Sequence, residues 1–180
     1  MNLTLRKPTA EDGSAIHELV QLCSPLDENS VYCNLLQASY FAETAVVAEG
    51  DGKLLGFITG FVSPKDPEVL FVWQVAVSPA ARGLGLALNM LEHLTARVQT
   101  QGVRFIETTI TDDNAASWAL FRRFAENRSA ELEHAPHFLS VTHFAGHHET
   151  ENLLRIGPVA GTVGASSLSS VADAQEPASV

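Results

Sequence analysis

One stretch of the sequence joins a strand to a helix through residues that can bind an anion. The run from Val69 to Ala96 opens with nine residues that are apolar except for Gln74. An apolar, Val-rich run of this kind predicts a strand buried on both faces. Ser78 and Pro79 end the strand. The helix that follows is expected to turn four apolar residues toward the core, namely Leu84, Leu88, Leu91 and Leu94.

The turn between that strand and that helix has the composition of an oxyanion site. It consists of Arg82, Gly83, Leu84, Gly85, Leu86 and Ala87. Glycines let the backbone approach an oxyanion closely, and unpaired N–H groups at a helix N-terminus attract negative charge. A dinucleotide-binding fingerprint does not fit, because Leu88 occupies the place of its third glycine, and no Gly-Lys-Ser/Thr completes a P-loop. A turn that merely connects strand to helix is the alternative.

Strands and helices alternate along the rest of the chain and would position this turn. Besides 69–77, strands are expected at 3–6, 45–49, 54–62, 105–110, 139–144 and 153–156. Helices are expected after an N-cap at Thr9, within 26–37, near Leu84 and at 115–125. This order predicts a three-layer α/β fold with a mixed sheet. Residues 158–180 contain no basic or aromatic residue and are expected to form a disordered tail rich in Gly, Ala and Ser.

The motif Arg82-x-x-Gly85-x-Ala87, after a strand that ends Val-Ala-Val-Ser-Pro, resembles the acetyl-CoA pyrophosphate loop of the GNAT family of N-acetyltransferases. The resemblance implies a GNAT domain over residues 1–157, with a mixed central sheet of six or seven strands flanked by helices. It also implies acetyl-CoA as co-substrate, held by Val75, Val77 and the turn, and a homodimer. In this family the oxyanion donor is a backbone N–H near Val75.

A second signature of the same family, Asn-x-x-Ser/Ala-x-x-Leu-Tyr/Phe, is similar to residues 114–121. The resemblance implies that the Asn114 amide meets the pantetheine arm and that Ser117 lets the arm lie against the helix. Phe121 stands where many members have a Tyr that protonates the departing thiolate. A thiol has a pKa near 8.5, so the thiolate can leave with a proton from water or from another Tyr. An ordinary N-capped amphipathic helix is the alternative.

Three further segments, residues 25–36, Trp73 and residues 147–156, resemble one GNAT subfamily. Its members acetylate the side-chain N4 of L-2,4-diaminobutyrate in ectoine biosynthesis. The resemblance implies a substrate with two amines and one carboxylate. Asp27 and Glu151 would hold its ammonium groups through charge-assisted hydrogen bonds, and Trp73 would wall its short carbon chain.

Tyr32, Asn29 and Asn34 would orient the carboxylate or the α-amine of such a substrate. Glu151, His148 and Tyr32 remain open as the general base. Simpler roles also remain open. Asp27 and Asn29 would serve as helix caps, Trp73 as core, and Glu151 as a solvated charge.

Two other functions remain open beside the leading one. The same carboxylates would serve a GNAT enzyme that acts on a polyamine, ornithine or an aminoglycoside. Phe121 also motivates a catalytically silent acyl-CoA-binding module. An assay of several amines for CoA release separates these alternatives.

Composition limits the partners. The chain of 180 residues, 46% hydrophobic, is long enough for one domain with a core. A net charge of −10, from 11 basic and 21 acidic residues, argues against nucleic acids and anionic membranes and suits a cationic substrate. The absence of an apolar run in residues 1–7 and of a membrane-length apolar segment predicts a cytoplasmic protein with Cys23 and Cys33 reduced. No metal is expected, because the late histidines lack ligand spacing.

Overall fold

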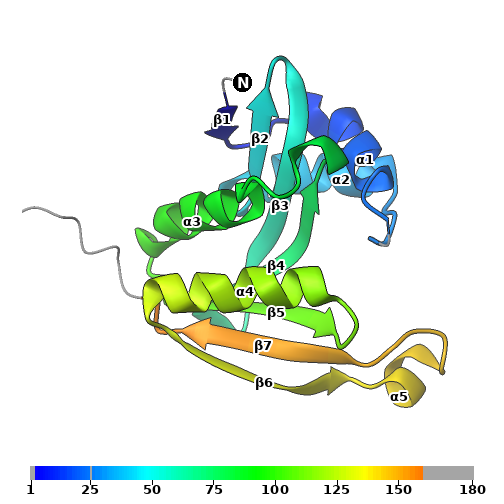
Figure 1. Ribbon diagram of the computed structural model, residues 1–180, viewed down its shortest axis with the longest axis vertical. Helices are drawn as coiled ribbons and strands as arrows, with labels where there is room; N and C mark the ends of the chain where they lie inside the picture. The colour runs from blue at the N-terminus through cyan, green and yellow to red at the C-terminus, as the bar shows by residue number, and fades with distance from the viewer. Residues whose placement is uncertain (1–2, 25, 160–180) are drawn as a thin grey trace, which may run out of the picture.

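A single mixed sheet runs through the molecule and carries helices on both faces (Figure 1). The computed structural model describes residues 3–24 and 26–159. Within them seven strands lie in the order β1-β2-β3-β4-β5-β7-β6. Their bounds are β1 (Leu3–Arg6), β2 (Val46–Gly50), β3 (Lys53–Ser63), β4 (Asp66–Val77), β5 (Phe105–Thr111), β6 (Glu131–Phe138) and β7 (Glu151–Gly157). Strands β4 and β5 are parallel and the other neighbours antiparallel, which confirms the predicted mixed α/β sheet.

The helices are α1 (Gly13–Gln21), α2 (Val31–Ser39), α3 (Leu86–Gln99), α4 (Ala115–Arg128) and α5 (Ser140–Phe144), with 3-10 turns η1 (Ala10–Asp12), η2 (Ala42–Thr44) and η3 (Pro79–Ala81). The helices α1 and α2 cover one face of this sheet and α3 and α4 the other, whereas α5 lies in the connection between β6 and β7 (Figure 1). Strand β2 shows how the core is divided, because side chains alternate between the faces of a strand. Val47 packs with α1 and α2, whereas Val46 and Ala48 pack with α3 and α4.

A β-bulge at Trp73 changes which face of the sheet the second half of β4 presents. Thr59 pairs with Gln74 while Gly60 pairs with Val72, so Trp73 is the extra residue. Val72 lies in the α3–α4 core, and the side chains beyond the bulge are reversed. Any side chain at Gly60 would meet the Phe71 carbonyl oxygen at 2.4 Å, so the bulge requires glycine there. The prediction that β4 is buried on both faces fails at Trp73, which is 43% exposed.

The parallel contact between β4 and β5 is short. The two strands pair over Val69 to Phe71 and Phe105 to Glu107. Within the described residues no further pairing joins them, and Figure 1 shows the strands running apart from there. The edge of β4 beyond Phe71 therefore faces away from β3 without a strand beside it.

In the last third of the chain one predicted strand is wrong, and one strand was not predicted. The stretch 139–144 was expected to be a strand, but it contains the helix α5. Its first turn is held by local side chains, because the Leu139 N–H donates to His143 Nδ1 at 2.7 Å and the Ser140 N–H to Thr150 Oγ1 at 3.1 Å. Strand β6 was not predicted, since its exposed and mostly polar sequence lacks an apolar face.

The helix after the glycine turn begins later than expected. Leu84 is not part of the core stripe of α3 but lies before the helix, 63% exposed.

The predicted tail at 158–180 falls mainly on residues 160–180, which lie outside the described residues. Val159 is buried, and its N–H donates to the Arg104 carbonyl at 2.7 Å. No described helix is long and apolar enough to cross a membrane.

Candidate active site

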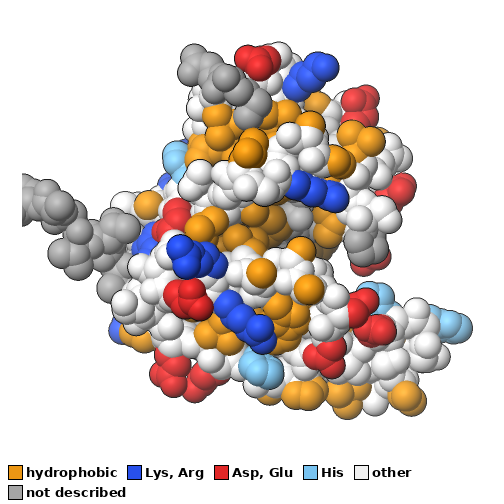
Figure 2. Space-filling model, in the orientation of Figure 1, with side chains coloured by type: hydrophobic (Ala, Val, Ile, Leu, Met, Phe, Trp, Pro, Cys, Tyr) orange, Lys and Arg blue, Asp and Glu red, His pale blue; other side chains and the backbone are white. Residues whose placement is uncertain are grey.

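A cavity of about 970 Å³ lies where β4 and β5 separate. Figure 2 shows the molecule hollowed on the right, between the part that carries α1 and α2 and the part that carries α5. Segments far apart in the sequence line the cavity: Leu26, Asp27 and Asn29; Val72, Trp73, Gln74 and Val75; Thr108, Thr109, Ile110 and Thr111; Asp113, Asn114, Ala115, Ala116, Ser117 and Phe121; and Ser140, Gly146, His147, His148, Glu149 and Glu151. Four of these side chains are carboxylates, so the site suits a cation.

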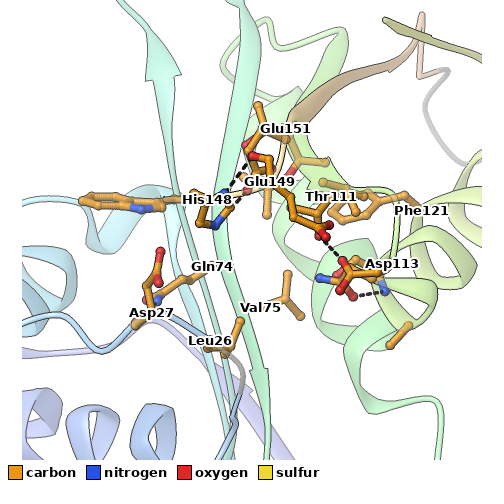
Figure 3. Close-up of a pocket in the computed structure, with 18 of the residues that line it drawn as sticks. Leu26, Asp27, Gln74, Val75, Thr111, Asp113, Phe121, His148, Glu149 and Glu151 are labelled. Carbon is orange, nitrogen blue, oxygen red and sulfur yellow. Dashed lines mark hydrogen bonds and ion pairs between the residues drawn. The ribbon is translucent and has the colours of Figure 1, made fainter. Parts of the chain in front are cut away.

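Asp27 belongs to this cavity and does not cap the next helix. The N-cap of α2 is Ser30, whose hydroxyl accepts the Cys33 N–H at 3.2 Å. The carbonyl of Asp27 instead accepts a hydrogen bond from Gln74 Nε2 at 2.9 Å. Figure 3 shows the Asp27 side chain on the opposite side of the cavity from Asp113. The capping alternative is thus excluded, and Asn29 also lines the cavity.

Glu151 brings a mostly buried carboxylate to the lining of this cavity. It is the first residue of β7, paired with Thr111 of β5. Its side chain is 18% exposed, and its Oε2 is buried with no hydrogen-bond partner among the described residues. A buried, unpaired carboxylate oxygen is unfavourable unless a donor reaches it. Glu151 is therefore not a solvated loop charge, and an ammonium group in the cavity would stabilise the charge of this mostly buried carboxylate.

His148 lies close to Glu149 and Glu151 in the lining of the cavity. Its Nδ1 lies 2.9 Å from the Glu149 carbonyl oxygen, and its Nε2 lies 3.9 Å from Glu151 Oε1 (Figure 3). The hydrogen bond to that carbonyl raises the pKa of His148, and the negative charges of Glu151, Asp27 and Glu149 raise it further against partial burial. A raised pKa favours the protonated imidazole, which weakens His148 as a base at neutral pH.

Trp73 lines the cavity and is partly exposed, which argues against a purely core role. Two other sequence-predicted substrate residues lie elsewhere. Tyr32 is 70% exposed on α2 and does not line the cavity. Asn34 is fully buried, with Oδ1 3.1 Å from His17 Nδ1 and Nδ2 donating to Gln37 Oε1 at 2.9 Å. The structure therefore brings Trp73 to the cavity but not Tyr32 or Asn34.

The glycine turn precedes α3 in an open position. Gly83 and Gly85 have φ of +77° and +71°, which side chains rarely adopt, and no atom lies within 4 Å of a Cβ built on either. The first amides of α3 have no partner within the helix. Arg82 is exposed, and its Nε donates to the Val77 carbonyl at 3.4 Å. The turn residues and Val77 lie outside the cavity lining, so an anion bound there would leave the cavity free for a second reactant.

The start of α4 faces the cavity between its walls. Asn114 caps the helix by accepting the Ser117 N–H at 3.1 Å, and both residues line the cavity. Helix capping and a place in the site thus coexist. Phe121 lines the cavity from the next turn and is buried. No tyrosine is among the lining residues of the described chain, so the site offers no phenol to a leaving thiolate.

The sequence did not predict several of the residues that line the cavity. Gln74 carried a signal, because it is the single polar residue in an apolar strand. Glu149 and Asp113 gave none, since exposed loop carboxylates are common. Among the described residues no group of three or more His, Cys, Asp or Glu is placed to hold a metal ion.

Parallel strands that separate around a cavity, and an open glycine turn at the head of the next helix, define a coenzyme A-dependent acyltransferase of the GNAT type. The chain belongs to this family: residues 14–125 match the Acetyltransferase (GNAT) family.

The chain is also similar to individual proteins of known name and to a solved structure. The chain is 51% identical over 156 residues to L-2,4-diaminobutyric acid acetyltransferase of Methylotuvimicrobium alcaliphilum, covering 87% of this chain and 91% of that protein. It is 49% identical to the protein of the same name from Vibrio cholerae, over 84% of this chain and 87% of that one. A solved structure, diaminobutyrate acetyltransferase EctA from Paenibacillus lautus in complex with L-2,4-diaminobutyric acid and coenzyme A, has a TM-score of 0.84. It is 41% identical and covers 91% of this chain and 99% of that chain.

Proposed function

We propose that this protein transfers an acetyl group from acetyl-CoA to N4 of L-2,4-diaminobutyrate, in ectoine biosynthesis. Relatives that carry this activity in their names, at 51% and 49% identity, support the assignment. The structural relative bound to diaminobutyric acid and coenzyme A supports it as well. The observation that carries it is the mostly buried carboxylate of Glu151, 18% exposed, in a cavity that Asp27 also lines. Two carboxylates suit a small amino acid with two ammonium groups.

The reaction follows from these positions. The side-chain amine loses a proton, for which Glu151 is the acceptor in this proposal, and its lone pair attacks the thioester carbonyl carbon. The tetrahedral oxyanion accepts a hydrogen bond from a β4 backbone N–H near Val75, on the edge that β5 leaves. The C–S bond then breaks, and CoA leaves as thiolate. The attacking nitrogen still carries one proton more than the amide needs, and water passes this proton to the thiolate, because Phe121 at the cavity cannot donate one.

Coenzyme A would lie between the glycine turn and α4. The backbone amides at 83–87 of the turn would receive the diphosphate, and the Arg82 side chain would add a positive charge. Asn114 and Ser117 would meet the pantetheine arm at the cavity wall. Holding thioester and amine in one geometry contributes several kcal/mol, roughly 7–11 at best, to lowering the barrier.

We also propose a domain boundary, an oligomeric state and a location for this protein. We expect the catalytic domain predicted at 1–157 to extend to the buried Val159, with the tail after it, and we expect a homodimer and a cytoplasmic location. Light scattering on the purified chain distinguishes a dimer from a monomer. Truncation after Val159 tests the domain: full activity supports it, and lost activity contradicts it.

A panel of amines tests the function. Thiol release from acetyl-CoA is measured with diaminobutyrate, ornithine, lysine, spermidine and an aminoglycoside, and the product is located by NMR. The highest kcat/KM is expected for diaminobutyrate, with the acetyl group on N4. A preference for lysine or spermidine contradicts the assignment. Tight acetyl-CoA binding without turnover of any amine would instead support a silent binding module.

The division of the site is tested by two variants. Arg82→Ala is expected to raise the KM for acetyl-CoA about tenfold and leave that for the amine within twofold, because the lost charge faces the diphosphate. Asp27→Ala is expected to raise the KM for the amine about tenfold and to leave that for acetyl-CoA within twofold. Equal effects of both variants on both substrates would contradict the two-part site.

A further inference from the structure

Gln74 lines the cavity, and the reaction above gives its side chain no role. It is 7% exposed and follows the bulge residue of β4. Its Nε2 donates to the carbonyl of Asp27 at 2.9 Å, across 47 residues of sequence. Figure 3 shows Gln74 reaching from β4 toward Asp27. A single side chain thus connects the segment that holds Asp27 to the strand that holds Val75.

Besides the packing of Leu26 against the core at α1, few contacts fix the position of the segment 26–29. Leu26 bonds within its own turn, through its N–H to the Cys23 carbonyl at 3.0 Å. Gln21 Nε2 reaches Glu28 Oε2 at 3.5 Å in an exposed position, which is a weak hydrogen bond. Asp27 itself is exposed. The place of its carboxylate therefore depends strongly on the hydrogen bond from Gln74.

The oxygen of the Gln74 amide shows that the hydrogen bond to Asp27 is obtained at the expense of stability. Its Oε1 is buried and has no hydrogen-bond partner among the described residues. A buried, unpaired acceptor destabilises a fold, and an apolar side chain of the same size would avoid this. A residue that is unfavourable for stability, yet ties a cavity segment to a cavity strand, is better explained by function.

We propose that Gln74 is a positioning residue for the amine substrate, which acts by holding the Asp27 main chain so that its carboxylate meets the substrate's ammonium group. This inference rests on the proposed function. Gln74 sets the distance from Asp27 to Val75 and Glu151, and thereby the length of diamine that fits. It does not itself contact the substrate, since its free oxygen is buried and its nitrogen is bound to Asp27.

Gln74→Met tests the proposal, because Met keeps the length and removes both polar atoms. We expect the KM for diaminobutyrate to rise about tenfold, as misplacement of a binding group does, and that for acetyl-CoA to stay within twofold. The melting temperature should equal or exceed that of the parent, because the unpaired buried oxygen is gone and Asp27, an exposed residue, can bind water instead. Hydrogen exchange in residues 26–30 should quicken, and the preference for diaminobutyrate over ornithine should shrink.

Two controls make the result specific. Thr59 pairs with Gln74 across the ladder and also has a buried, unpartnered oxygen, but it does not line the cavity. Thr59→Val should therefore leave both KM values within twofold. In an Asp27→Ala background Gln74→Met should add less than twofold, because the group it positions is absent.

Two results would overturn the inference: an unchanged amine KM in Gln74→Met, or equal rises in both KM values with a lower melting temperature. A failure of the proposed function shows separately, as a parent enzyme that does not prefer diaminobutyrate. In that case the same variants are measured with the best amine of the panel.

Discussion

Glu151 is the proposed proton acceptor in the cavity, so its substitution tests the reaction most directly. Glu151→Gln keeps the shape but can neither accept a proton nor pair with an ammonium ion. We expect kcat/KM for the amine to fall at least about 100-fold, within the usual range for a general base, with the KM for acetyl-CoA within twofold. Thiol release under steady-state conditions measures both.

Glu149→Gln is the matched control, because Glu149 lines the same cavity and takes part chiefly through its backbone carbonyl. Its loss should stay below about tenfold. Equal losses in the two variants would mean that the cavity uses only its total negative charge.

His148 gives the stability of the protein a dependence on pH. Its pKa is raised in the folded state, first by the Glu149 carbonyl and then by nearby carboxylates. Folding therefore binds a proton, so the stabilisation is complete below the unfolded pKa of about 6.5 and is lost as pH rises through the higher folded value. The melting temperature of the parent relative to His148→Gln should be highest near pH 5.5 and should decline toward pH 8.5. A difference independent of pH would contradict this.

At the scale of elements, α2 is anchored by polar side chains and not by a continuous apolar face. Asn34, Gln37 and His17 form a chain of hydrogen bonds beneath α1 and α2, and Asn34 and Gln37 are fully buried. Asn34→Ala would leave His17 and Gln37 each without a partner. We expect a loss of roughly 1–3 kcal/mol in unfolding free energy, with both KM values within twofold. Calorimetry and kinetics measure the two effects.

The result for Asn34 also decides between two roles. An amine KM raised without loss of stability would restore the substrate-binding role that the sequence favoured. Spacing alone could not separate these, because a polar residue near a functional segment looks the same whether it points to the cavity or into the core.

Elements with local signals were predictable from the sequence. The glycines of the turn and the Asn114 cap act within a few residues, and each lies where expected. Elements that depend on distant contacts were not. Strand β6 exists because β7 offers it an edge, and α5 depends on a hydrogen bond from Ser140 to Thr150 ten residues on.

The site was predictable to a similar degree. Asp27, Trp73 and Glu151 do reach one cavity, as the resemblance implied. The bulge at Trp73 could not be seen in advance, since it depends on how β3 and β4 align. Without it, Gln74 would stay on the same face as Val72, and the tie to Asp27 would be lost.

For the whole molecule, charge divides the two substrates. Diaminobutyrate carries two ammonium groups and one carboxylate at neutral pH, a net charge of +1, whereas acetyl-CoA is a polyanion. The protein has a net charge of −10, and Asp27, Asp113, Glu149 and Glu151 line the cavity. Its field therefore attracts the amine and repels the cofactor, which leaves the glycine turn and Arg82 to bind the cofactor by short-range contacts.

Salt should consequently act on the two substrates with opposite sign. The Debye length shortens from about 10 Å at 0.1 M to about 3 Å at 1 M, which screens the field beyond direct contacts. Over that range of KCl we expect kcat/KM for the amine to fall several-fold, roughly three- to tenfold, and kcat/KM for acetyl-CoA to hold or rise. Sucrose at equal osmolality controls for water activity and should change neither. If both values fell in parallel, salt would be acting on the fold and not on the encounter, and the acidic cavity would matter only at contact distance.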